Sequence, residues 1–300
     1  MDSAIHTIAE LSDPSMPIFY TGKILKEYTS SVQTWAVVST NNGECLFINN
    51  QLQSNNRDEA LYHEYMVHSL LSGIKSPKNV LVLGGGEGCI IREVLKWDTI
   101  ENVTMVDWDE SLCKYFMNEG RHWNDGAYDD KRVNLICMDA LEYVFSCKEK
   151  YDAIYIDLLD PVDGNMSYLT QVINYAKQCL LPTGGLIINA GNVQKGVGTP
   201  ACDLAEFLTN KFKDPPYFRC AIKVYVPSYM DEWCFLFVAG KLWPLNSIDN
   251  SLPPLTYFTR EELIESMKWD DDYPMVLQEF WKPIKKLSDI CNDYNGKYGC

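Results

Sequence analysis

The chain has 300 residues, is 46% hydrophobic and carries 41 acidic against 26 basic residues, which gives a formal net charge of −15. This length and apolar content allow a well-buried core, in one large domain or in one large and one small domain. The negative charge argues against nucleic acid and anionic membranes as partners, because phosphate groups would be repelled. A cationic ligand suits the charge better, although many chains are acidic for solubility alone.

The eleven cysteines are scattered along the chain without a CxxC pair. This spacing is typical of reduced thiols in a reducing compartment, and we expect no metal. The first residues, MDSAIHTIAELSDPSM, lack a basic flank followed by an apolar stretch, and no run approaches the roughly 18 apolar residues that a membrane span requires. We therefore expect a soluble, cytoplasmic protein.

The first predicted elements are strands. Between Gly22 and Asn50, the segments ILKEYTSS, VQTWAVVST and ECLFIN are rich in β-branched and aromatic residues, and an NNG turn joins the last two. They predict a small antiparallel β unit within residues 1–55. The next segment, RDEALYHEYMVHSLLSG, spaces its apolar residues three and four apart and ends at Gly73, which predicts a helix.

From residue 79 onward, strands and helices alternate. Short apolar strands are predicted at 79–83, 103–106, 133–137, 153–157 and 185–190, and helices at 90–97, 110–118, 140–145 and 167–180. This alternation predicts a parallel sheet covered on both faces, which makes residues 56–245 a doubly wound α/β domain. Residues 217–227 and 233–239 are expected to form an antiparallel hairpin at the sheet edge.

Beyond Lys241 the alternation is lost. Residues 246–300 contain an amphipathic pattern at 274–287, which indicates a helix, but no motif with recognisable chemistry. We treat this part as a C-terminal extension of unknown role.

A glycine-rich turn follows the strand at 79–83. The segment VLVLGGGEGCIIREVL places Gly84, Gly85, Gly86 and Gly88 between a strand and a helix, where the backbone can turn tightly and a ligand can approach closely. The turn alone is weak evidence, because nucleotide, flavin and S-adenosylmethionine proteins share it and it sometimes only permits helix packing. Glu87 inside this loop would repel a pyrophosphate, which favours a ligand without phosphate.

Two further carboxylates follow the next two strands. Asp107 comes 23 positions after Gly84, where an acidic residue can accept hydrogen bonds from both ribose hydroxyls. Asp139, beside Ala140, suits a contact with the exocyclic amine of adenine. Each aspartate alone could simply cap a helix. Together with Glu87 they predict a nucleoside site, because ligands bind at the carboxyl ends of the strands in such sheets.

The fourth strand ends in YDAIYIDLLDPVDG, so that Asp157 lies at its terminus and Asp160 follows just before Pro161. Two converging carboxylates suit a cationic substrate, whereas a loop capped by aspartates and turned by proline is the structural alternative. An amine is mostly protonated at pH 7, so a nucleophilic amine must lose a proton. One carboxylate could anchor the cation and another could accept the proton.

From about Thr29 to Ala239, these residues resemble the spermidine synthase family. The matching segments, in family order, are QLQSNNRDEALYHEYMVH, GGGEG, MVDWDE, CMDA, DLLDP and VPSYMDEW. Within the family, GEG, DPVDG and the VPSY segment look more like the thermospermine synthase branch. The resemblance implies a Rossmann-like sheet of the S-adenosylmethionine methyltransferase type. It also implies a polyamine aminopropyltransferase, which moves the aminopropyl group of decarboxylated S-adenosylmethionine to putrescine or spermidine and releases methylthioadenosine.

The resemblance implies a role for individual residues. Asp157 would accept the amine proton and Asp160 would hold the acceptor, with Tyr62 and Tyr229 lining the acceptor side. On the donor side the matching residues are Gln33, Gln53, His63, Gly84, Gly86, Glu87, Asp107, Asp139 and Ala140. Among these, Glu87 would bind the ammonium of the aminopropyl group. The family pattern further implies decarboxylated S-adenosylmethionine as co-substrate, no permanently bound cofactor, and a homodimer.

Two departures from the family pattern leave the choice of acceptor open. Asn49 and Asn50 stand where the family usually has Asp-Gly, so that this turn is expected to be reshaped. Asn189 stands where a glutamine is common. Two other functions also stay open: an S-adenosylmethionine-dependent methyltransferase on the same fold, and a catalytically silent regulatory paralogue.

Overall fold

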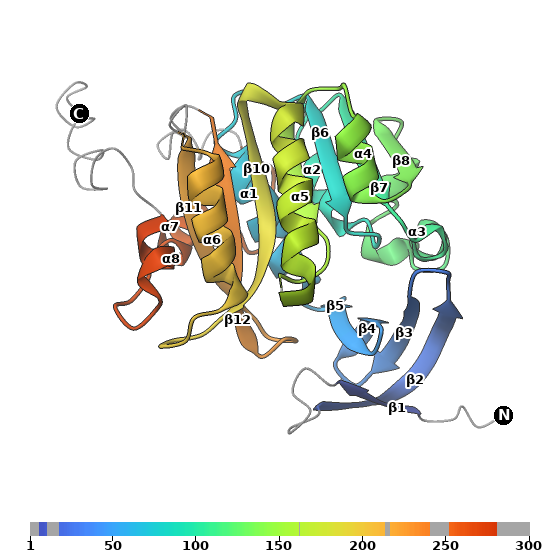
Figure 1. The fold of residues 1–300 in the computed structure, drawn as a ribbon. Coiled ribbons are helices and arrows are strands. Elements are labelled where there is room, and N and C mark those ends of the chain that lie inside the picture. The colour runs from blue at the N-terminus through green and yellow to red at the C-terminus, as the bar shows by residue number, and fades with distance from the viewer. Residues whose placement is uncertain (1–5, 11–17, 162, 214–216, 241–251, 281–300) are drawn as a thin grey trace.

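Two β-sheets form the framework of the molecule (Figure 1). The computed structural model describes residues 6–10, 18–161, 163–213, 217–240 and 252–280. A five-stranded sheet at the N-terminus lies beside one end of a seven-stranded sheet, and helices cover the larger sheet on both faces. A pocket, described below, lies where the two sheets meet.

The N-terminal sheet is fully antiparallel, with its strands in chain order. They are β1 (His6–Glu10), β2 (Ile18–Thr29), β3 (Thr34–Thr40), β4 (Gly43–Ile48) and β5 (Gln51–Asn55). Side chains alternate between its faces: Val38 and Phe47 form a small core of their own, whereas Val37 and Leu46 join the core of the larger sheet. This alternation attaches the small sheet to the rest of the molecule. The strand pattern at residues 22–50 missed β1, the first residues of β2 and the whole of β5.

The seven-stranded sheet has the order β11-β12-β10-β9-β6-β7-β8. Its strands are β6 (Asn79–Gly84), β7 (Asn102–Asp107), β8 (Val133–Cys137), β9 (Tyr151–Asp157), β10 (Leu180–Val193), β11 (Phe218–Val226) and β12 (Asp231–Ala239). Strands β6 to β10 run parallel, and β12 pairs antiparallel with both β10 and β11. The expected doubly wound sheet with an antiparallel edge hairpin is confirmed.

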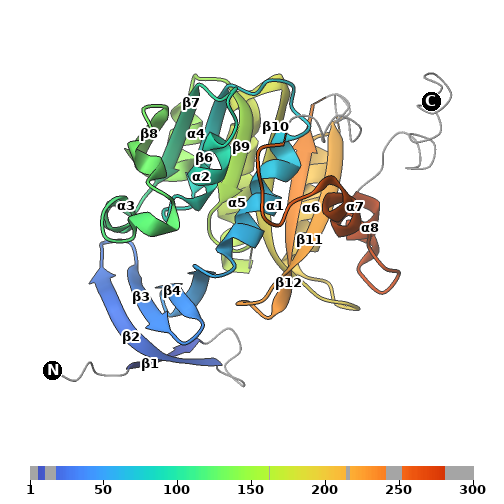
Figure 2. The same ribbon diagram turned by 180° about the vertical axis from the view of Figure 1, so that it is seen from behind.

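Helices cover both faces of this sheet (Figures 1 and 2). They are α1 (Glu59–Leu71), α2 (Cys89–Leu95), α3 (Glu110–Met117), α4 (Ala140–Ser146), α5 (Asp163–Cys179), α6 (Pro200–Lys211), α7 (Arg260–Ser266) and α8 (Met275–Phe280), with short 3-10 turns at Arg121–Trp123 and Ala127–Asp129. Val80 and Val82 pack into one core with α1, α2, α3 and α7. Leu81 and Leu83 pack into the other with α4, α5, α6 and α8, so each central strand is buried on both faces.

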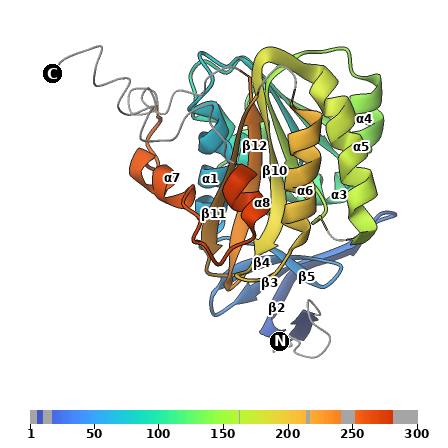
Figure 3. The ribbon, with the colours of Figure 1, turned by 60° about the vertical axis from the view of Figure 1, so that its left-hand side comes forward.

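The structure differs from the sequence prediction mainly after β10. Helix α6 was not predicted, although Ala201, Leu204 and Leu208 have helical spacing behind Pro200. Figure 3 shows the extension folded back along the sheet edge, with α8 beside α6. Of the helix predicted at 274–287, the structure has α8, and residues 281–287 lie outside the described part. The proposed boundaries of the three chain segments stay a prediction.

The strand order creates a crevice at the carboxyl ends of β6 and β9. These strands are neighbours, and the helices that follow them, α2 and α5, lie on opposite faces of the sheet. Ligands of open α/β sheets bind at such a point. The N-terminal sheet closes the crevice from the other side (Figure 1). In the described ranges, no helix combines the length and the apolar character that a membrane crossing needs.

Candidate active site

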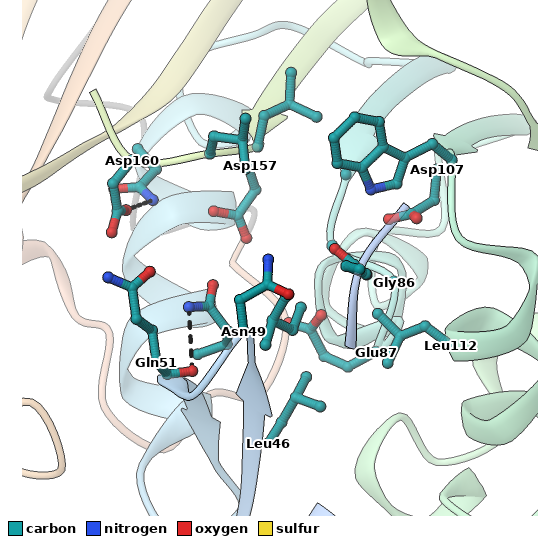
Figure 4. A pocket seen from close by; sticks show the side chains of 18 of the residues that line it. Leu46, Asn49, Gln51, Gly86, Glu87, Asp107, Leu112, Asp157 and Asp160 are labelled. Atoms are coloured by element: carbon teal, nitrogen blue, oxygen red, sulfur yellow. Dashed lines mark hydrogen bonds between the residues drawn. The ribbon is translucent and has the colours of Figure 1, made fainter. Parts of the chain in front are cut away.

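A pocket of about 220 Å³ occupies this crevice. Strands β4 and β5 contribute one wall, and the loops after β6, β7 and β9 contribute the other. Figure 4 shows the carboxylates of Glu87, Asp157 and Asp160 gathered around one space. Asn49 and Gln51 face them from the N-terminal sheet. The pocket therefore combines acidic groups with apolar side chains such as Leu46 and Leu112.

The glycine-rich loop forms the floor of the pocket. Gly84 has a φ of +83°, and a β-carbon there would clash with the carbonyl oxygen of Asp157 on the neighbouring strand. A β-carbon on Gly86 would lie 2.9 Å from the Leu112 side chain and 3.1 Å from an Asp107 carboxylate oxygen. Glycine is therefore required here by the close packing of the loop against β9, α3 and Asp107, whereas the approach of a ligand to this turn stays a prediction.

Glu87 is held by a buried chain of charges. The His63 ring contacts Glu87 Oε1 through Nε2 at 3.0 Å and Glu59 Oε2 through Nδ1 at 2.9 Å. Arg92 donates two hydrogen bonds to the Glu59 carboxylate, at 2.7 and 2.9 Å. Burial lowers the pKa of His63, but the hydrogen bonds to Glu59 and Glu87 outweigh it and raise that pKa to about 10. The ring is thus an imidazolium between two carboxylates.

The same contacts keep Glu59 ionised and involve a histidine that belongs to a group of potential metal ligands. Burial raises the pKa of Glu59, but hydrogen bonds from His63 and Arg92 prevail and bring it to about 2. The ligand atoms of His63, Glu87 and Asp157 lie within 4.8 Å of one another. Both ring nitrogens of His63 are already engaged by Glu59 and Glu87, so this histidine could bind a metal only by giving up one of these contacts together with its proton.

Asp107 ends β7 and is 8% exposed. One of its oxygens accepts the backbone N–H of Asp109 at 2.8 Å, which fixes the carboxylate at the pocket wall. Burial raises the pKa of Asp107 to about 7, and the nearby charge of Glu87 acts in the same direction. Two ribose hydroxyls that donate to this carboxylate would favour its charged form.

Asp139 is the exception among the predicted residues, because it does not line the pocket. Its Oδ1 accepts the backbone N–H of Glu142 at 3.0 Å and caps α4, and its Oδ2 accepts the Tyr168 hydroxyl at 3.0 Å. The neighbouring Ala140 and Tyr168 do line the pocket. A role of Asp139 at adenine stays a prediction, and in this structure the residue acts as a helix cap.

Asp157 lies at the end of β9, at the centre of the pocket (Figure 4). The buried Tyr62 hydroxyl donates to its Oδ1 at 2.8 Å. Burial, followed by the charge of Glu87, raises the pKa of Asp157 to about 6, although His63 and the Tyr62 hydrogen bond oppose the shift. This carboxylate is a stronger base than an ordinary aspartate and is still mostly ionised at neutral pH.

The tyrosine pair and Asp160 complete the side of the pocket next to β12. The rings of Tyr62 and Tyr229 meet edge to face, with centroids 6.3 Å apart, and the Tyr229 hydroxyl donates to the carbonyl oxygen of Gln53 in β5. Asp160 accepts a hydrogen bond from Asn189 Nδ2 at 3.3 Å. Burial raises the pKa of Asp160, and the bond from Asn189 opposes this.

The chain matches a family model described as the spermine/spermidine synthase domain over residues 59–250. It belongs to the spermine/spermidine synthase family. A polyamine aminopropyltransferase of Saccharolobus islandicus is 32% identical over 280 residues, covering 89% of each chain. One of Saccharolobus solfataricus is 36% identical over 219 residues, covering 72% of this chain and 71% of the relative.

A solved structure supports the fold of this family member. A spermidine synthase in complex with the transition state analogue AdoDATO superimposes with a TM-score of 0.81, covering 93% of this chain and 97% of the other at 19% identity. The expected family and Rossmann-like fold are confirmed. The roles assigned to individual residues are not tested by these matches.

The structure brings the predicted site residues of this family member together, apart from Asp139. The twelve that line the pocket are Gln33, Gln53, Tyr62, His63, Gly84, Gly86, Glu87, Asp107, Ala140, Asp157, Asp160 and Tyr229. Asn49 and Asn50 have positive φ values of 50° and 65°. Both central residues of an ordinary type I′ hairpin turn, which Asp-Gly also forms, have positive φ, so the expected reshaping of this turn stays a prediction.

Several lining residues were given no site role in the sequence analysis. Trp108 and Trp233 lie inside the family motifs MVDWDE and VPSYMDEW, but neither string says where an indole points. Asn165 and Tyr168 come from α5, which begins at Asp163 inside the DPVDG segment. Proximity to the motifs was the only available signal for these residues.

Proposed function

We propose that this protein is a polyamine aminopropyltransferase that uses decarboxylated S-adenosylmethionine as its co-substrate. The observation that carries this proposal is the set of three carboxylates, Glu87, Asp157 and Asp160, that line one pocket next to the glycine-rich loop. Two organic cations must meet in such an enzyme, and this pocket offers negative charge to both. The names of the curated relatives agree with this activity.

In the proposed reaction, the leaving group needs no protonation, whereas the nucleophilic amine must be activated. The amine lone pair forms the new C–N bond while the C–S bond breaks, and the electron pair of that bond stays on sulfur, which leaves as neutral methylthioadenosine. The attacking amine must first be deprotonated, since its ordinary pKa is near 10. Asp157 accepts that proton, and its pKa of about 6 makes it a better base than an unperturbed aspartate.

The charge of the pocket favours the decarboxylated donor over S-adenosylmethionine itself. Among the described residues that line the pocket, none is a lysine or an arginine. The His63 imidazolium is already engaged by Glu59 and Glu87. A donor carboxylate would therefore meet Glu87 and Asp157 without a compensating cation, which disfavours the methyltransferase alternative.

Finer features of the proposal come from the sequence motifs. We propose putrescine or spermidine as the acceptor, with the VPSYMDEW and DPVDG segments favouring the thermospermine synthase branch. We also propose a homodimer in the cytoplasm. A light-scattering mass near that of one 34.3 kDa chain would contradict the dimer.

A donor comparison tests the proposed function. The protein is incubated with putrescine, spermidine or longer polyamines, together with either decarboxylated S-adenosylmethionine or S-adenosylmethionine, and the products are separated by chromatography. We expect methylthioadenosine and an amine longer by one aminopropyl group with the decarboxylated donor only. Tighter binding of S-adenosylmethionine would favour a methyltransferase. No release of methylthioadenosine with any amine would favour a silent paralogue.

A further inference from the structure

The Asn189 amide is fixed in one orientation by two donors. Its Oδ1 accepts the Trp233 indole N–H at 2.7 Å and the backbone N–H of Gly191 at 2.8 Å. A flipped amide would turn its NH₂ group toward both of these donors and lose both hydrogen bonds. Asn189 is 7% exposed, so water cannot easily replace those partners. The NH₂ group consequently faces Asp160, at 3.3 Å.

A bulge in β10 makes this arrangement possible. The pairing of β10 with β12 shifts register between Asn189 and Asn192, so that two residues of β10 stand opposite Cys234 alone. Gly191 in the bulge has a φ of +75°, which favours glycine. This local twist turns the Gly191 N–H back to the Asn189 side chain. The bulge also packs against Pro161, directly after Asp160.

The charged form of Asp160 depends on the Asn189 amide. Burial makes its charged form costly, and the Asn189 hydrogen bond is the contact that opposes the rise of its pKa. The charge of Asp160 in turn helps to raise the pKa of Asp157, since the two carboxylates repel one another. Without the amide donor, Asp160 would more readily become a neutral acid and would attract an ammonium group less strongly.

We propose that Trp233 is a positioning residue of the acceptor site, whose indole N–H fixes the Asn189 amide so that Asp160 presents a charged, oriented carboxylate to an ammonium group of the acceptor. This inference rests on the proposed function, in which Asp160 holds the amine. Trp233 also lines the pocket and packs against Tyr229, with ring centroids 4.7 Å apart. A direct contact between Trp233 and the amine is thus the competing explanation. The two explanations differ in whether the effect of a Trp233 substitution on amine affinity depends on Asn189.

A double-mutant cycle on amine binding distinguishes them. The dissociation constants of spermidine and putrescine are measured by titration calorimetry with saturating methylthioadenosine, for the wild type, Trp233→Phe, Asn189→Ala and the double variant. We expect each single variant to weaken amine binding roughly tenfold, as the loss of a hydrogen bond to a charged group implies. The double variant should be no weaker than Asn189→Ala, because Trp233 acts through the amide.

Control measurements separate this effect from a loss of folding. Trp269→Phe removes an indole hydrogen bond outside the pocket, to the Ala221 carbonyl oxygen at 3.1 Å, and should leave amine binding unchanged. Methylthioadenosine affinity should be the same in all variants. If Trp233→Phe does not fold, unchanged amine binding in Asn189→Ala would still overturn the inference, because Trp233 is proposed to act through that amide.

Several results would overturn the inference. Unchanged amine binding in Trp233→Phe or in Asn189→Ala would do so, as would an equal loss from Trp233→Phe in both backgrounds, which indicates direct contact. A wild type that binds no amine would also contradict it. If the wild type binds amines but releases no methylthioadenosine from decarboxylated S-adenosylmethionine, the proposed function fails. The role of Trp233 in amine binding is then still decided by the effect of Trp233→Phe on the amine dissociation constant in the wild-type and Asn189→Ala backgrounds.

Discussion

At the scale of single residues, the chemistry depends on the charge of Asp157. Its pKa of about 6 has opposing causes: burial and Glu87 raise it, whereas His63 and the Tyr62 hydroxyl lower it. A base must be deprotonated to act, so kcat should fall as the pH drops through this pKa. Tyr62→Phe removes a hydrogen bond that favours the charged form, and the acidic limb of the kcat profile should move up by about one pH unit.

A matched variant controls for the loss of a buried hydroxyl. Tyr65 lies on the same helix and is buried against Phe258, away from the pocket. Tyr65→Phe should leave the acidic limb where it is in the wild type. A Tyr62→Phe profile that coincides with the wild type, or one that moves to lower pH, would contradict the assigned hydrogen bond.

At the scale of elements, the His63 chain of charges ties α1 to the loop before α2. The folded pKa of His63, about 10, lies above the ordinary value of 6.5. Its contribution to stability is therefore fully present below pH 6.5 and is lost as the pH rises toward 10. Chemical unfolding between pH 6.5 and 10 should show a decline on the order of a few kcal/mol that is smaller in His63→Gln. An equally steep decline in that variant would contradict an imidazolium at this position.

A second link at this scale joins the C-terminal extension to α1. The Glu64 carboxylate, 1% exposed, accepts the backbone N–H groups of Thr256, Tyr257 and Phe258 at 2.7 to 3.1 Å. Helix α1 carries Tyr62 and His63, so the extension supports the helix that serves the site. Glu64→Ala would remove the charged partner of these three donors, of which Phe258 is buried, and the free energy of unfolding should fall by about 3 kcal/mol.

Urea unfolding with a surface control measures this effect. Glu265 lies in the same extension, and its side chain is 72% exposed and paired with Lys268. Glu265→Ala should change the free energy of unfolding by less than about 0.5 kcal/mol, as is usual for a surface ion pair. Equal effects of the two variants would mean that Glu64 does not anchor the extension.

The sequence predicted the elements whose residue pattern lies within one short segment of the chain. Buried parallel strands appear as apolar runs such as Asn79–Gly84, and a glycine-rich turn must follow a strand that approaches a ligand. Contacts between distant residues have no such signal. Nothing near Glu64 indicates that its partners lie about 190 positions later, and nothing near Asn189 indicates that Trp233 holds its amide.

The same distinction applies to the pocket residues. Motif spacing predicted the positions of Asp107, Asp157 and Glu87, because the two aspartates end β7 and β9 and Glu87 lies in the loop after β6. It could not decide whether Asp139 would contact a ligand or cap α4, since both uses need a carboxylate at a strand end. Only the arrangement of Glu142 and Tyr168 around it shows that both oxygens are already engaged.

At the scale of the whole molecule, two sheets of different construction share one acidic pocket. The parallel sheet supplies the carboxylates, and the N-terminal sheet supplies amide side chains such as Gln33 and Gln51. With a net charge of −15, we expect the molecule to attract the proposed cationic substrates from solution. The Michaelis constant for the amine should therefore rise with ionic strength, and steady-state kinetics between low and high salt measure this. A Michaelis constant that does not change with salt would contradict such attraction.

We propose above that Asp157 removes a proton from an amine, which then attacks the carbon beside sulfur. The most direct measurement compares methylthioadenosine release by the wild type and Asp157→Asn, with decarboxylated S-adenosylmethionine and spermidine or putrescine. We expect the variant to lose roughly 10²- to 10⁴-fold in turnover while it binds methylthioadenosine as the wild type does. Turnover by Asp157→Asn at the wild-type rate would contradict the account.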